Sequence, residues 1–235
     1  MSSCGAGDRR RPEPQARGRA DLASLPVAVI GAGPVGLAAA VHLLERGLEP
    51  VVLEAGPSVG TAPRDWGHVP MFSPWRYNVD RAARALLERH GWTAPDLEAY
   101  PTGRDLAERY LGPLAALPEL APRLRLNARV TGIARAGAGK LRDTGRERQP
   151  FEVRFRDAGG QEGRLLARAV VVATGTWGNP GPAGASGLPA LGEREAADRI
   201  RYGMPDVLGA EIGRYGRRRI LVVGTGHSAL GTRGR

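Results

Sequence analysis

The sequence predicts an α/β fold that is built on a parallel β-sheet, and three observations support this prediction. The first is a set of short, unbroken apolar runs at residues 27–30, 51–53 and 169–173, which is the pattern of strands buried on both faces. The second is a glycine-rich turn directly after the first run, followed by a helix of small and apolar residues. The third is the alternation of apolar and polar residues at 124–133 and 151–156, which is typical of half-exposed antiparallel strands. We therefore expect a parallel sheet with an antiparallel meander beside it.

The composition limits the class of protein. The chain has 235 residues, of which 42% are hydrophobic, so it can bury a core. No stretch approaches the ~20 apolar residues that span a bilayer, and no membrane partner is expected. The formal net charge is +10, but the basic residues are scattered among acidic ones and aromatic residues make up only 5%, so no nucleic-acid partner is expected. The single cysteine, Cys4, excludes disulfide scaffolds, CxxC redox centres and cysteine metal sites, and no other spacing predicts a metal site.

Residues 1–25 are predicted to be a disordered leader. Residues 1–20 are rich in Gly, Pro and Arg and show no apolar periodicity. The arginines at 9–11 are not followed by the apolar stretch of an export signal, so we expect a cytoplasmic location.

A dinucleotide-binding βαβ unit is predicted between the first two apolar runs. The turn reads Gly31-Ala-Gly33-Pro34-Val-Gly36 and precedes the helix. In such a turn the first glycine allows the tight bend and the second lets the backbone approach a pyrophosphate, while the third lets the helix pack against the strand. The pyrophosphate lies at the positive end of the helix dipole. Glu54, which follows the second strand, can accept hydrogen bonds from both ribose hydroxyls and repels a 2′-phosphate, which favours FAD or NAD over NADP.

Two capped helices are expected in the middle of the chain. Asn78 or Asp80 is placed to cap a helix that stops at Gly91. The segment 102–105 resembles a capping box before a helix that reaches about Leu117. Beyond these helices, residues 124–133, 151–156 and 164–168 supply the predicted antiparallel strands, and residues 178–218 form an irregular connector rich in Gly and Pro.

A second, incomplete nucleotide fingerprint is expected at residues 219–235. The apolar run 219–223 predicts a further buried strand, and it leads into a second glycine turn and the start of a helix. The candidate ligand-binding residues of this turn are Gly224, Gly226, Ser228 and Ala229. The acidic or basic residue that would choose between NADH and NADPH falls beyond the last residue.

The three motifs VAVIGAGPVGLAAA…VVLE, VVVATGTWGNP and ILVVGTGHSA, in this order, resemble the flavoproteins with two dinucleotide-binding domains, especially flavin-containing monooxygenases and related FAD-dependent pyridine-nucleotide oxidoreductases. The resemblance covers about residues 26–230. It implies a Rossmann-like FAD-binding domain at 26–177, a connector at 178–218 and the start of a truncated Rossmann-like NAD(P)-binding domain at 219–235.

The resemblance also assigns roles to individual residues. It implies that Gly31, Gly33, Pro34, Gly36 and Glu54 hold the ADP part of FAD, that the backbone of Val130 contacts the adenine, that Thr174 and Gly175 pass close to FAD, and that Gly224, Gly226, Ser228 and Ala229 belong to an NADPH or NADH site. No catalytic side chain is predicted, because in a flavoprotein the cofactor carries the chemistry.

The function that this resemblance implies is an FAD-dependent oxidoreductase of the flavin monooxygenase type, in which NAD(P)H reduces FAD for the oxidation of a small organic substrate. The signature FxGxxxHxxxY/W of the monooxygenases is absent from 177–219, and the helix after the second fingerprint breaks off in Gly and Arg residues. Two alternatives therefore stay open: an inactive dinucleotide-binding fragment, and an NAD(P)H-dependent flavoprotein reductase without oxygen chemistry. An incomplete sheet also leaves apolar surface uncovered, so self-association is expected.

Overall fold

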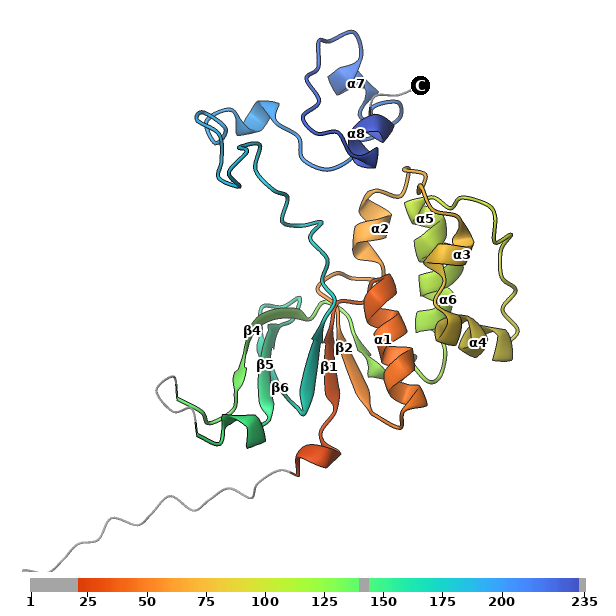
Figure 1. The fold of residues 1–235 in the computed structure, drawn as a ribbon, viewed down its shortest axis with the longest axis vertical. Helices are drawn as coiled ribbons and strands as arrows, with labels where there is room; N and C mark the ends of the chain where they lie inside the picture. Colours follow the sequence, from red (N-terminus) through yellow and green to blue (C-terminus); the bar gives the residue numbers. More distant parts are fainter. Residues whose placement is uncertain (1–20, 140–143, 233–235) are drawn as a thin grey trace, which may run out of the picture.

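The computed structural model describes residues 21–139 and 144–232 (Figure 1). Most of the predicted leader, with Cys4, lies outside the described residues. Where the described chain begins, the predicted leader is ordered: the Asp21 carboxylate accepts a hydrogen bond from the N–H of Ala23 and caps a 3-10 helix at Leu22–Ser24. No helix in the described ranges is long and apolar enough to cross a membrane.

A four-stranded parallel sheet forms the centre of the fold, with the strand order β3-β2-β1-β7. Strand β1 (Val27–Ile30) pairs with β2 (Pro50–Leu53) on one side and with β7 (Ala169–Val172) on the other. Helix α1 (Pro34–Glu45) connects β1 to β2, as the sequence predicts. The glycine turn therefore lies at the carboxyl end of the central strand, the edge where ligands bind in open α/β sheets.

The segment predicted as one antiparallel strand at 124–133 is divided between the two sheets. Strand β3 (Leu124–Arg125) joins the parallel sheet beside β2, and only β4 (Arg129–Arg135) is antiparallel to its neighbour. The chain turns between them at Asn127, which has a φ of 53°. Asparagine tolerates this left-handed conformation, and the alternation of apolar residues continues across the turn without revealing it.

An antiparallel sheet covers one face of the parallel sheet (Figure 1). It has the order β4-β5-β6, where β5 is Phe151–Arg156 and β6 is Glu162–Ala167, which confirms the predicted meander. The core between the two sheets is made of buried side chains from both, namely Ala28, Ile30, Leu53, Ala128, Val153 and Ala167.

Helices cover the opposite face of the parallel sheet (Figure 1). Besides α1 they are α2 (Thr61–Asp65), α3 (Trp75–Asn78), α4 (Arg81–Arg89), α5 (Gly103–Leu106), a π-helical turn (Ala107–Leu111) and α6 (Gly112–Ala115). The Asp80 carboxylate caps α4 by accepting hydrogen bonds from the N–H groups of Ala82 and Ala83, as one of the two predicted caps. Thr102 and Asp105 form the predicted capping box of α5. Beyond α5 the expected single helix is interrupted by the π turn, at which Tyr110 is buried, and burial raises the pKa of its hydroxyl to about 12.

The C-terminal segment extends away from the sheet (Figure 1, blue). It contains the short helices α7 (Ile212–Tyr215) and α8 (His227–Thr232). Residues 219–223 lie within the described chain and form no strand there, so the prediction of a buried strand at this run is wrong. Their side chains are exposed instead: Ile220 is 51%, Leu221 is 87% and Val223 is 71% exposed. A strand needs a neighbour to satisfy its backbone N–H and C=O groups, and no described strand lies beside this run to supply one.

Candidate functional site

The glycine turn after β1 is held tightly against the neighbouring strands. The N–H of Gly31 donates to the carbonyl oxygen of Leu53 over 2.8 Å, and its φ of 103° lies in the region that favours glycine. A Cβ at Gly31 would lie 2.7 Å from the carbonyl oxygen of Ala173, in the turn that follows β7. The ends of β1, β2 and β7 thus meet at this glycine.

The other two glycines of the turn have different surroundings. A Cβ at Gly36 would lie 1.9 Å from the carbonyl oxygen of Gly31, so only glycine lets α1 approach the turn. A Cβ at Gly33 would meet no described atom within 4 Å. Gly33 is also the N-cap residue of α1, and because it has no side chain, no side-chain hydrogen bond caps the helix there. Pro34 occupies the first helical position. This leaves open space at a helix N-terminus, which is the arrangement that fits a pyrophosphate.

Glu54 follows β2, and its carboxylate both faces the glycine turn and holds it in place through hydrogen bonds. Its Oε2 accepts a hydrogen bond from the N–H of Ala32 over 2.7 Å, and its Oε1 accepts one from the N–H of Gly56 over 2.8 Å. The carbonyl oxygen of Ala32 in turn accepts a hydrogen bond from the N–H of Gly60 over 3.0 Å. Sequence reasoning missed this supporting role. Each carboxylate oxygen keeps lone pairs for a further donor, so the half-buried group can also accept ribose hydroxyls.

The remaining residues predicted for this site lie at the same edge of the sheet. The N–H of Ala128 donates to the carbonyl oxygen of Glu54 over 2.7 Å, which brings the start of β4, and with it the half-buried Val130, next to the end of β2. Thr174 and Gly175 follow β7 directly and are exposed. The structure therefore brings together Gly31, Gly33, Pro34, Gly36, Glu54, Val130, Thr174 and Gly175.

The second glycine turn does not share this edge. Gly224 has a φ of 124°, as a tight turn requires, and the N–H of Ala229 donates to the carbonyl oxygen of Gly226 over 3.0 Å. The turn that holds Gly226, Ser228 and Ala229 therefore has no strand of the described chain before it. The ring of His227 stacks on Phe72, with centroids 4.3 Å apart and planes inclined by 18°. The assignment of this turn to NADPH or NADH stays a prediction.

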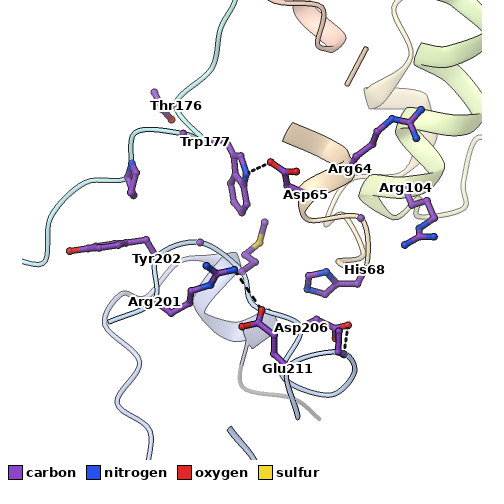
Figure 2. A pocket seen from close by; sticks show the side chains of 16 residues that line it. Arg64, Asp65, His68, Arg104, Thr176, Trp177, Arg201, Tyr202, Asp206 and Glu211 are labelled. Atoms are coloured by element: carbon purple, nitrogen blue, oxygen red, sulfur yellow. Dashed lines mark hydrogen bonds and ion pairs between the residues drawn. The ribbon is translucent and has the colours of Figure 1, made fainter. Parts of the chain in front are cut away.

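A cavity of about 750 Å³ lies between the end of α2 and the connector (Figure 2). The indole Nε1 of Trp177 donates to Oδ2 of Asp65 over 3.1 Å and closes one side of it. Among the residues that follow β2, Trp75 is buried in the core and Trp66 packs against Gly103, whereas His68 lies on the cavity. Across the described ranges, no three His, Cys, Asp or Glu side chains group closely enough to hold a metal ion.

The connector is organised by one carboxylate, that of Glu193, which is buried. It accepts hydrogen bonds from the N–H groups of Ala183 and Ala190 and from the hydroxyl of Tyr202. The hydrogen bond from Tyr202, followed by those from Ala183 and Ala190, holds the pKa of Glu193 below its ordinary value of 4.5. Because Tyr202 lines the cavity, Glu193 fixes the cavity wall.

We expect the Glu193→Gln variant to open this part of the connector. The amide presents donor hydrogens to groups that are themselves donors, so tryptic cleavage at Arg194 and Arg199 should be faster than in the parent chain. Since the pKa of Glu193 is lowered in the fold, its stabilisation is present above the ordinary carboxyl range and is lost as the pH falls through the lowered pKa. The backbone amides of this segment in the parent chain should therefore lose protection from hydrogen exchange as the pH falls through that pKa. In the tryptic assay Glu195→Gln, at an exposed neighbour, should behave as the parent chain. Equal cleavage of all three chains would contradict this role.

Comparisons with known proteins agree with this geometry. Residues 26–104 match the family described as FAD dependent oxidoreductase. The bacillithiol disulfide reductase of Bacillus cereus has a similar structure, with a TM-score of 0.50 and 25% identity, and the alignment covers 66% of this chain and 41% of that one. No curated protein matches the chain.

Two further solved structures are similar at lower scores. OTEMO in complex with FAD and NADP has a TM-score of 0.47 and 22% identity, covering 65% of this chain and 26% of that one. An oxidized steroid monooxygenase bound to NADP has a TM-score of 0.46 and 26% identity, covering 63% and 26%. The chain thus aligns with less than half the length of each of these proteins. Together, the match over residues 26–104 and the fold show that this chain fits the superfamily of FAD-dependent oxidoreductases, as the sequence resemblance predicts.

Proposed function

We propose that this chain binds FAD at the glycine turn and is part of an oxidoreductase of the flavin monooxygenase type, in which NAD(P)H reduces FAD for the oxidation of a small organic substrate. The observation that carries the proposal is the open space at Gly33, at the uncapped N-terminus of α1, with the Glu54 carboxylate fixed beside it. A turn that served only to connect β1 to α1 has no need of this space.

The residues of the site bind and orient the cofactor. The N-terminus of α1 and the backbone at Gly33 hold the pyrophosphate, Glu54 accepts the ribose hydroxyls, and the backbone of Val130 lies toward the adenine. The exposed turn at Thr174 and Gly175 lines the path toward the flavin ring. When bound, FAD supplies the redox chemistry, taking a hydride from NAD(P)H and passing two electrons to oxygen or an organic acceptor. With one cysteine in the sequence, the chain has no internal dithiol to take these electrons.

Turnover measurements separate this proposal from its two alternatives. Steady NADPH oxidation by the FAD-loaded chain is expected for either enzyme, and an inactive fragment shows none. Oxygen-dependent oxidation of a substrate is expected for a monooxygenase, whereas a reductase oxidises NADPH with an organic acceptor in the absence of oxygen. Parallel assays with NADH identify the preferred nucleotide.

The Glu54→Gln variant is expected to bind FAD about tenfold more weakly or worse, because the amide loses charge-assisted hydrogen bonds to ribose worth about 1.5–3 kcal/mol. In the parent chain ADP-ribose should compete with FAD, and its 2′-phosphorylated form should not. The variant should lose part of this discrimination. Flavin fluorescence during titration measures both effects.

A matched control is Glu49→Gln, at the opposite end of β2, where the carboxylate pairs with Arg123 on the surface. This variant should bind FAD as the parent chain does. If Glu54→Gln and Glu49→Gln bind FAD equally well, Glu54 does not hold the ribose.

The chain is expected to self-associate. Large apolar side chains lie exposed along the C-terminal segment, namely Leu188, Leu191, Leu208, Leu221 and Val223. Sedimentation at increasing protein concentration should show oligomers, and replacing Leu191 and Leu221 with serine should shift the distribution toward the monomer. A parent chain that remains monomeric throughout the series would contradict this expectation.

A further inference from the structure

The charged groups that line the cavity between α2 and the connector are not all paired. Its three carboxylates have partners: Asp65 accepts the Trp177 indole N–H, Asp206 accepts the N–H groups of Gly209 and Ala210, and Glu211 lies 3.7 Å from the guanidinium of Arg201. Figure 2 shows the contacts of Asp65 and of Glu211 on opposite sides of the cavity. The cavity therefore presents no carboxylate that lacks a donor.

Two of the basic side chains differ from the others. Arg64 donates to the carbonyl oxygen of Val59 and pairs with Glu108, and Arg201 pairs with Glu211. Within residues 21–139 and 144–232, the side chains of Arg104 and His68 have no hydrogen-bond or ion-pair partner, and both are exposed on the cavity. These two side chains of the cavity, which remain without a partner, are therefore a cation and a potential hydrogen-bond donor.

The backbone places Arg104 and His68 on adjacent segments. The N–H of Arg104 donates to the carbonyl oxygen of Gly67 over 3.1 Å, and the N–H of Gly103 donates to that of Val69 over the same distance. The next residues, Pro70 and Thr102, form an antiparallel bridge. These contacts flank His68 on both sides, so backbone pairing holds His68 and Arg104 on neighbouring segments.

Part of the cavity lining is apolar. The ring of Trp177 is half-buried, held by Asp65, and lies so close to Gly203 that a Cβ there would be 2.9 Å from it. The flexible thioether of Met204 also lines the cavity. A planar apolar body can pack against these two side chains while its acidic group faces Arg104.

We propose that this cavity binds a small planar organic acid through its carboxylate, with Arg104 and His68 as the donors and Trp177 and Met204 as the apolar wall. This inference rests on the proposed function, because it assigns small planar organic acids as the substrate class of the proposed oxidoreductase. Trp177 follows the exposed turn at Thr174 and Gly175 by two residues, so the bound acid lies at the side of the FAD site where the flavin ring is expected.

Calorimetric titration of the full chain with benzoate tests this assignment, and benzamide is the uncharged probe of the same shape. We expect benzoate to bind and benzamide to show little or no binding. Arg104→Gln should weaken benzoate binding about tenfold or more, because a charge-assisted hydrogen bond is lost, and Arg104→Lys should restore part of it. Arg129→Gln removes an exposed arginine on β4, far from this wall, and should bind benzoate as the parent chain does.

Several outcomes would overturn the assignment. Equal binding of benzoate and benzamide would show that the carboxylate is not recognised, and equal weakening by Arg104→Gln and Arg129→Gln would show that only the net charge matters. Thermal unfolding by circular dichroism identifies a variant that has lost its fold, in which case Arg104→Lys carries the comparison. FAD retention is measured separately on the same proteins. A parent chain that retains FAD and does not bind benzoate refutes this inference alone, and a parent chain that binds benzoate and does not retain FAD refutes the proposed function alone.

Discussion

The Gly33→Asp variant is expected to keep its fold and to lose FAD. The backbone at Gly33 has φ −82° and ψ −173°, which any residue adopts, and an added Cβ would meet no described atom within 4 Å. Aspartate is also among the preferred N-cap residues, so the stability of α1 should be unchanged or raised. The same carboxylate occupies the space assigned to the pyrophosphate and repels its charge. Like charges brought together at a binding site cost several kcal/mol, and about 1.4 kcal/mol is a tenfold change, so FAD affinity should fall more than about 100-fold.

Gly33→Ser separates charge from size in this experiment. Serine is an equally good N-cap residue and carries no charge, so the variant should bind FAD more weakly than the parent chain and more strongly than Gly33→Asp. Urea unfolding and FAD titration of the three proteins are the two measurements. If Gly33→Asp binds FAD as tightly as the parent chain, the space beside Gly33 is not the pyrophosphate site.

The Gly36→Ala variant should have the opposite phenotype, a loss of stability in the absence of any ligand. Helix propensity alone predicts that alanine in α1 stabilises the chain by up to about 1 kcal/mol. The added Cβ would, however, lie 1.9 Å from the carbonyl oxygen and 3.0 Å from the carbonyl carbon of Gly31, both of which are backbone atoms. Because neither the turn nor α1 can move away without breaking its hydrogen bonds, we expect a net destabilisation of about 3 kcal/mol or more, as for overpacked cores.

Gly132→Ala is the matched control for this substitution. Gly132 lies on the exposed β4 strand, where an added Cβ would meet nothing described within 4 Å, so its free energy of unfolding should change little. The midpoints of urea unfolding of the two variants and the parent chain give the comparison. A Gly36→Ala variant as stable as the parent chain would contradict the close packing of α1 on the turn.

The central unit could be predicted from the sequence because its signals are local. The glycine turn, Glu54 and the apolar runs at 27–30 and 51–53 lie within about 30 residues of one another, the size of a single βαβ unit. The caps at Asp80 and Thr102 were predictable for the same reason, since each acts on the first turn of its own helix. The parallel sheet with an antiparallel meander beside it is confirmed, although its strand β3 was predicted as part of the meander.

The cavity could not be predicted, because its contacts join distant parts of the chain. Asp65 and Trp177 are 112 residues apart, and the pairing that brings His68 beside Arg104 depends on backbone hydrogen bonds that leave no pattern in the sequence. The prediction of a strand at 219–223 was wrong for a related reason. These residues have strand propensity, but a strand forms only where a neighbouring strand pairs with it. The Glu54 contact with Ala32 follows from the packing of two loops, so its supporting role emerges only in the structure.

The visible absorbance spectrum of the chain, after addition of FAD and gel filtration, tests the central claim most directly. The fit between the open N-terminus of α1 and a pyrophosphate predicts that FAD stays with the protein, one molecule for each chain, and that Gly33→Asp passes through the same column colourless. A parent chain that is itself colourless after this treatment, yet folded by circular dichroism, would contradict the assignment of the glycine turn to FAD.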